Sequence, residues 1–190
     1  DTRLAALQHF NIQWAQAATD VNDPWPPYVQ AANDQFIAAR NETLPDGLWE
    51  SVPSKELASW PGLPYALLYL RWEALYPDEW TAHVGGWGTK TGMLQCLAED
   101  AAHLPADVID DLIELIVSAV LREHRRGDDG YARLVQALRS PQLHDRLQPL
   151  TQHAHSGYRL RAGYLLWLLR HPEAAHAKPF QWKTWLATHG

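Results

Sequence analysis

The chain of 190 residues is poor in sulfur, with one cysteine, Cys96, and one methionine. A single cysteine excludes an intramolecular disulfide and any zinc site built from several thiolates. A lone thiol suits a reducing compartment, so we expect a cytoplasmic location. Cys96 stands among Leu94, Gln95 and Leu97 at helical spacing, which favours a packed thiol over a catalytic one.

Long apolar runs are missing as well. The best stretches are 63–70 and 164–169, whereas a membrane helix needs roughly 18 to 20 apolar residues. We therefore expect a soluble protein with no membrane partner. The sequence begins at Asp1 instead of methionine, so it does not decide whether a leader or a tag preceded this residue.

Catalytic and strand patterns are the third absence. The sequence has no G-x-S-x-G elbow, no HExxH motif and no alternating strands joined by hairpin turns. We predict an all-α class, with residues 1–190 in a single globular multi-helix domain of about seven to nine helices. Stacked helical hairpins are compatible with this pattern. We expect no cofactor, and a protein that is not an enzyme.

The strongest periodic signal lies in residues 104–126. Apolar residues recur at helical spacing along one side, and Asp107, Asp110, Asp111 and Glu114 fall on the other. Acids lie in the early turns and arginines in the last ones, as the helix dipole favours. We predict a long amphipathic helix that ends at Gly127 and forms the centre of the fold.

Charge is divided unevenly along the chain. Residues 1–121 carry five basic and 17 acidic residues, a net charge of −12, and residues 122–190 carry 11 basic and five acidic residues, a net charge of +6. Acidic and basic helices that pack side by side would explain this division. Alternatively, the acidic part binds a basic partner or the basic part binds an acidic one.

Tryptophan is abundant, with ten residues, seven of them between Trp14 and Trp87. Several stand beside proline or glycine, outside clean helical patterns. Tryptophan often anchors protein interfaces because it buries a large area at little cost in rotamer entropy. Our leading hypothesis is a non-enzymatic interaction protein, of an inhibitor, immunity-type or regulatory kind and bacterial in style, that binds a basic protein. The predicted interface residues are Trp25, Trp49, Trp60, Asp78, Glu79, Trp80 and Trp87.

Two alternatives rest on charged residues. The arginines of the basic part lie among tyrosines, which is compatible with phosphate contacts and base stacking in a nucleic-acid binder. Asp110, Asp111 and Glu114 form a DDxxE spacing that resembles the magnesium-binding motif of helical isoprenoid enzymes. That resemblance covers five residues and implies a small Mg²⁺-dependent enzyme acting on a diphosphate. The dipole of the helix also explains these acids as a solvated stripe.

Two further patterns suggest weak sites. The Gly-dense loop of residues 85–92 lacks the Walker A order, but Thr89, Lys90 and Thr91 before the next predicted helix suggest an anion site. A tight turn around a tryptophan is the simpler explanation. His153 and His155 could chelate a metal in an extended loop, although scattered surface histidines are commoner.

Overall fold

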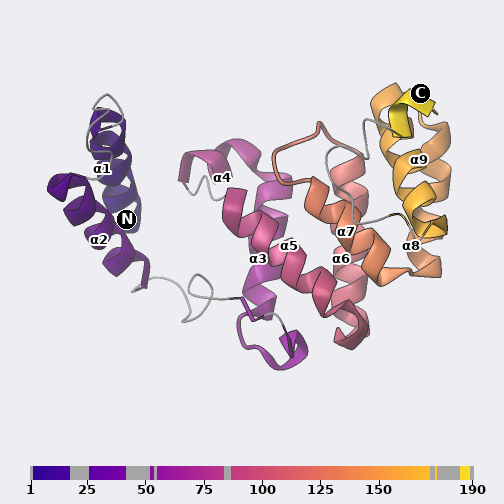
Figure 1. Cartoon of the computed structure of the whole chain (residues 1–190), viewed down its shortest axis with the longest axis horizontal. Coiled ribbons are helices and arrows are strands. Elements are labelled where there is room, and N and C mark those ends of the chain that lie inside the picture. Colours follow the sequence, from indigo (N-terminus) through magenta and orange to yellow (C-terminus); the bar gives the residue numbers. More distant parts are fainter. Residues whose placement is uncertain are drawn as a thin grey trace.

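The computed structural model describes residues 2–17, 26–41, 52–53, 55–83, 87–171, 174 and 185–188. These residues form nine α-helices of seven or more residues, three 3-10 helices and a short helical turn at 185–188, and no strand occurs among them, so the predicted all-α class is confirmed (Figure 1). The α-helices are α1 (Thr2–Ala17), α2 (Pro27–Asn41), α3 (Leu63–Leu75), α4 (Pro77–His83), α5 (Trp87–Glu99), α6 (Ala106–Val120), α7 (Asp129–Leu138), α8 (Pro141–Leu147) and α9 (Ser156–Arg170). The 3-10 helices are η1 (Leu57–Ser59), η2 (Ala101–His103) and η3 (Gln148–Gln152).

Local sequence explains several helix ends. Pro64 and Pro141 occupy the first turns of α3 and α8, where the missing N–H has no intrahelical partner to lose. The Ser140 side chain caps α8 by accepting from the Leu143 N–H at 3.4 Å. Asp100, which is almost fully buried, accepts from the Leu57 N–H at 2.8 Å and so ties η1 to the end of α5.

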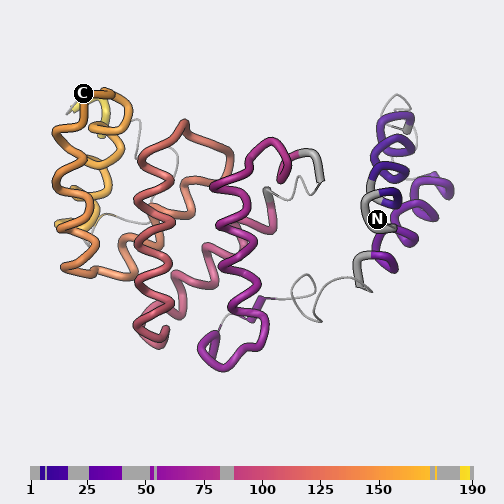
Figure 2. Tube along the Cα trace, turned by 180° about the vertical axis from the view of Figure 1, so that it is seen from behind, coloured from indigo at the N-terminus to yellow at the C-terminus, as the bar shows by residue number. Residues whose placement is uncertain are grey.

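The first two helices pack on each other as a hairpin. The rings of Phe10 and Phe36 stack with their centroids 6.1 Å apart, and Val29 and Ala32 are buried. Figures 1 and 2 both show this hairpin to one side of the other helices. The large buried cluster of the remaining helices takes all its described residues from Leu57 onward, so the α1–α2 hairpin is not part of it.

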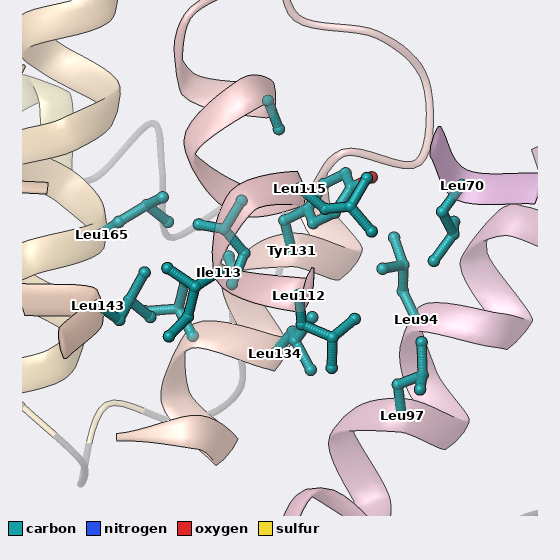
Figure 3. Close-up of a cluster of buried hydrophobic side chains, with 14 of the residues drawn as sticks. Leu70, Leu94, Leu97, Leu112, Ile113, Leu115, Tyr131, Leu134, Leu143 and Leu165 are labelled. Atoms are coloured by element: carbon teal, nitrogen blue, oxygen red, sulfur yellow. The ribbon is translucent and has the colours of Figure 1, made fainter. Parts of the chain in front are cut away.

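Two layers of helices make up the rest. α6 packs against α3, α7, α8 and α9, and α5 packs against α7. Figure 2 shows α3 and α6 side by side with α5 and α7 behind them. Leucines from both layers meet in the core between them (Figure 3). The labelled residues are Leu70, Leu94, Leu97, Leu112, Ile113, Leu115, Tyr131, Leu134, Leu143 and Leu165. Hence the prediction that α6 is central is correct.

The end of the long predicted helix is different from the prediction. α6 stops at Val120, six residues before Arg126, and residues 121–128 form a connection to α7. Arg122 and Arg125 therefore do not lie in a last helical turn. They point inward instead, because two buried carboxylates need cations beside them, as described below.

Candidate functional site

The predicted tryptophan interface is only partly within the described structure. Trp25 and Trp49 lie outside the described residues. Trp87 begins α5, but its side chain is not part of the described structure. Trp60 is half-buried, packs against the core and lies over Gly62. The described tryptophans therefore do not gather into one exposed cluster.

Trp80 corrects the prediction of an interface anchor. Its side chain is fully buried in the core and lies edge-on to Tyr69, with ring centroids 5.6 Å apart. The reason is the short helix α4, which turns Trp80 inward while it leaves Asp78 and Glu79 exposed in its first turn. We therefore keep these two acids as candidate surface residues and assign Trp80 to the core.

The predicted anion loop is also corrected. α5 begins at Trp87, so Thr89, Lys90 and Thr91 belong to a helix, not to a loop before one. Lys90 is fully buried, and its Nζ lies 2.6 Å from Asp128 Oδ1 and 3.1 Å from Glu73 Oε2. Its charge is satisfied inside the protein and does not face a ligand in solvent.

Lys90 belongs to a buried ion-pair network that sequence patterns did not indicate. We use this name for Glu73 of α3, Lys90 of α5, Arg122 and Arg125 of the α6–α7 connection, and Asp128 before α7. Glu73 is fully buried, and its Oε2 also lies 3.3 Å from Arg122 Nη2. Arg125 Nη1 lies 3.1 Å from Glu73 Oε1 and donates to the Glu73 backbone carbonyl at 2.6 Å.

Asp128 is the second acid of the network. The Arg122 guanidinium donates to both its oxygens at 2.8 Å, and the backbone N–H of Arg125 donates to it at 2.7 Å. Burial by itself raises the pKa of Asp128, but the Arg122 hydrogen bonds and the Lys90 charge outweigh burial and hold the pKa below its ordinary value. Burial likewise works against the charged form of Arg122, whose pKa is nevertheless raised by Asp128 and Glu73.

The buried ion-pair network connects several helices to one another. Its five charges come from α3, α5 and the α6–α7 connection. Arg161 of α9 donates to the Val120 carbonyl at the end of α6 at 2.9 Å and to the Arg122 carbonyl of the connection. Beside the network, burial raises the pKa of the Tyr131 hydroxyl above its ordinary range. Because Asp128 is held ionised by several donors, it is poorly suited to act as a proton acceptor.

The acids of α6 face outward, as the solvated-stripe explanation predicts. Asp110 is exposed. Asp111 pairs with Arg71 of α3, and Glu114 pairs with Arg146 of α8, whose Nη2 lies 2.9 Å from Glu114 Oε2. Within the described part of the chain, no group of three or more metal-ligating side chains is close enough to hold an ion. The Mg²⁺ hypothesis would require two of these acids to leave their arginines.

The arginines of the basic part are largely occupied within the chain. Besides the network arginines and Arg146, Arg159 donates to the carbonyls of His153 and Ala154 at 2.8 and 2.9 Å. Arg139 donates to the Gln136 carbonyl at 3.0 Å. These contacts consume donors that phosphate groups would need, so the structure gives a nucleic-acid interface little support.

An exposed apolar face on α3 is the feature that sequence reasoning missed. Leu68 and Leu75 are 56% and 66% exposed, and Tyr65 and Tyr76 are 45% and 58% exposed. At about 100° of rotation per residue, positions 65, 68, 72, 75 and 76 fall within an arc of roughly 100°. We call Tyr65, Leu68, Trp72, Leu75 and Tyr76 the apolar stripe. The opposite side of α3 packs into the core through Ala66, Leu70 and other buried residues.

The signal that could have revealed the stripe is the composition of α3. Residues 63–76 are apolar on every side except at Arg71 and Glu73, and such a helix must either be covered all round or present an apolar surface. The structure exposes Leu68 and Leu75 because α3 lies at the edge of its layer (Figure 2).

Acidic residues border the apolar stripe. Asp78 and Glu79, in the first turn of α4, stand two and three residues after Tyr76. On the side of α6, the ion pair between Arg71 and Asp111 joins the two helices. We call Asp78, Glu79 and Asp111 the acidic border, and the stripe and border together the α3–α6 face.

Comparison with protein-family models, with curated proteins and with solved structures finds no match for this chain. None of the described helices has the length and apolar character required to cross a bilayer. The interpretation of the site therefore rests on its geometry.

Proposed function

We propose that this chain is a non-enzymatic, all-helical interaction protein that binds a basic protein partner through the α3–α6 face. An inhibitor, an immunity-type protein and a regulatory protein all act by covering a surface of a partner in this way. The proposal rests above all on the apolar stripe of α3. It keeps the partner class expected from the sequence and moves the interface from the tryptophans to this helix.

The exposed leucines support a binding role for the stripe. Leu68 and Leu75 each leave more than half of the side chain in water. Burial of apolar surface stabilises by roughly 25 cal/mol per Å², so two leucines and two tyrosines on one arc form a source of binding free energy. Contiguous apolar patches on a protein surface often mark sites of protein association, and tyrosine is enriched among the residues that dominate binding energy.

The charges beside the stripe support a basic partner. Asp78 and Glu79 are exposed, and Arg71 is paired with Asp111. Acids at the rim of an apolar interface attract a partner of opposite charge and repel an acidic one. The charge of −12 over residues 1–121 extends this preference beyond the face itself.

Capture of the partner from extracts of the source cells tests the proposal. The Leu68→Gln/Leu75→Gln variant removes the apolar stripe, and Ile12→Gln is the matched control because Ile12 is also 56% exposed but lies on α1. We expect the wild type and the Ile12 variant to retain the same basic protein and the double variant to lose it, with all three showing equal helix content by circular dichroism. Equal capture by all three would overturn the proposal.

A further inference from the structure

We infer that the partner presents a basic amphipathic helix of about three turns, which packs lengthwise along the apolar stripe of α3. This inference rests on the proposed function and specifies the form of the partner. The stripe runs from Tyr65 to Tyr76, and at 1.5 Å per residue this distance corresponds to roughly 16 Å along the helix axis. It is one residue row wide and three turns long.

The shape of the stripe matches a helix better than other peptide forms. A strand binds by adding to a sheet edge, and the described residues contain no strand to extend. Two helices pack when side chains spaced three and four residues apart on one fill the grooves of the other. The positions 65, 68, 72, 75 and 76 have this spacing, so a partner helix with apolar residues at i, i+3 or i+4, i+7 and i+11 complements them.

The acidic border specifies the charge of that helix. Asp78 and Glu79 lie at the Tyr76 end of the stripe, and on the side of α6 Asp111 pairs with Arg71 of α3. A helix seated on the stripe would place some of its flanking side chains near these acids. Lysine or arginine at the flanks is therefore favoured, and glutamate or aspartate is repelled.

The same charges disfavour two other occupants. A second copy of this chain, related by a two-fold axis, would bring one acidic border against another. A membrane surface carries anionic lipids in its cytoplasmic leaflet, which the border would repel. Both remain outcomes of the experiment below.

Two synthetic peptides test the inference with the full chain. Both have about 18 residues and the same leucine stripe, and one carries lysines and the other glutamates at the flanking positions. Fluorescence anisotropy measures the dissociation constant of each labelled peptide at low and at high salt. We expect the lysine peptide to bind at least about tenfold more tightly than the glutamate peptide, a difference of roughly 1.4 kcal/mol, and salt to reduce this difference.

Three variants locate the bound helix. Leu68→Gln/Leu75→Gln should weaken the lysine peptide by about tenfold or more, a loss of roughly 1.4 kcal/mol, and Ile12→Gln should not change it. Asp78→Asn/Glu79→Gln should weaken the lysine peptide several-fold and leave the glutamate peptide unchanged or tighter. Equal binding of both peptides, or no effect of the acid variant, would overturn the inference.

Other outcomes separate this inference from the proposed function. Partner capture that depends on the stripe, together with no binding of either peptide, would overturn the helical form of the partner and leave the proposed function standing. If neither stripe-dependent capture nor peptide binding is observed, both the inference and the proposed function are overturned. Sedimentation that shows a dimer dependent on Leu68 and Leu75 would assign the face to a second copy. Binding to vesicles of phosphatidylcholine and phosphatidylserine would assign it to a membrane, and either result overturns the inference.

Discussion

Arg122 and Asp128 form a bidentate ion pair in which Nη1 and Nη2 each lie 2.8 Å from one carboxylate oxygen. The two residues are six positions apart, so their ion pair joins the two ends of the connection between α6 and α7. Lys90 of α5 also pairs with Asp128. Because Asp128 is almost fully buried, an unpaired charge left at this position has no water to solvate it.

Removal of one partner from this buried pair should therefore destabilise the fold strongly. We expect Asp128→Ala to lower the free energy of unfolding by about 3–5 kcal/mol. Glu114→Ala is the matched control, because Glu114 also meets an arginine but on the surface, and we expect a loss of about 0–1 kcal/mol. Urea denaturation followed by circular dichroism measures both values, and equal losses would mean that the network does not fasten the helices.

The pH dependence of stability follows from the lowered pKa of Asp128. In the unfolded chain an aspartate titrates at about pH 4, and in the folded protein Asp128 titrates below that value. Its contribution to stability is thus fully present above about pH 4 and is lost as the pH falls through the folded-state pKa. Urea titrations between neutral pH and strong acid should show this loss in the wild type and a shallower one in Asp128→Asn, and parallel curves would contradict the assignment.

Close packing of α5 on α7 predicts a contrast between two glycines. A Cβ at Gly130 would lie 2.8 Å from Leu94 Cδ1 and 2.9 Å from Leu94 Cβ, whereas a Cβ at Gly92 meets nothing within 4 Å. We expect Gly130→Ala to destabilise by about 1–3 kcal/mol. Gly92→Ala in the helix α5 should stabilise by about 0.5–1 kcal/mol. Thermal and urea unfolding of the two variants check the contrast, and destabilisation by both would refute it.

The burial of Trp80 predicts that its loss affects stability. Truncation of a buried tryptophan typically costs about 3–5 kcal/mol, so Trp80→Ala should unfold at a much lower urea concentration than the wild type. Leu75→Ala, in the exposed apolar stripe, should change stability by no more than about 0.5 kcal/mol. If Leu75→Ala proved as costly as Trp80→Ala, the stripe would be part of the core and not a free surface.

Helical periodicity predicted the elements of this fold well and their charged contacts poorly. The apolar spacing of 104–126 located α6, but the position of its end depends on Glu73, which is 49 residues away from Arg122 in the chain. Periodicity reports only neighbours three or four residues apart. It could therefore not show that the side chains of Arg122 and Arg125 point inward, or that Lys90 is buried although glycines surround it in the sequence.

The candidate site shows the same limit. Asp78 and Glu79 were predicted as surface residues from their own neighbourhood, and they are exposed. Trp80, one residue further, was assigned to the same surface, but the direction in which a short helix faces depends on what packs beneath it. The exposure of Leu68 and Leu75 depends equally on the place of α3 at the edge of its layer.

Carbene footprinting read by mass spectrometry tests the central claim most directly, because it reports which side chains a partner covers. The full chain is labelled alone and with its captured partner, and modification of Leu68, Leu75 and Ile12 is compared. The account predicts that the partner suppresses labelling at Leu68 and Leu75 and leaves Ile12 unchanged. Unaltered labelling of both leucines in the complex would contradict it.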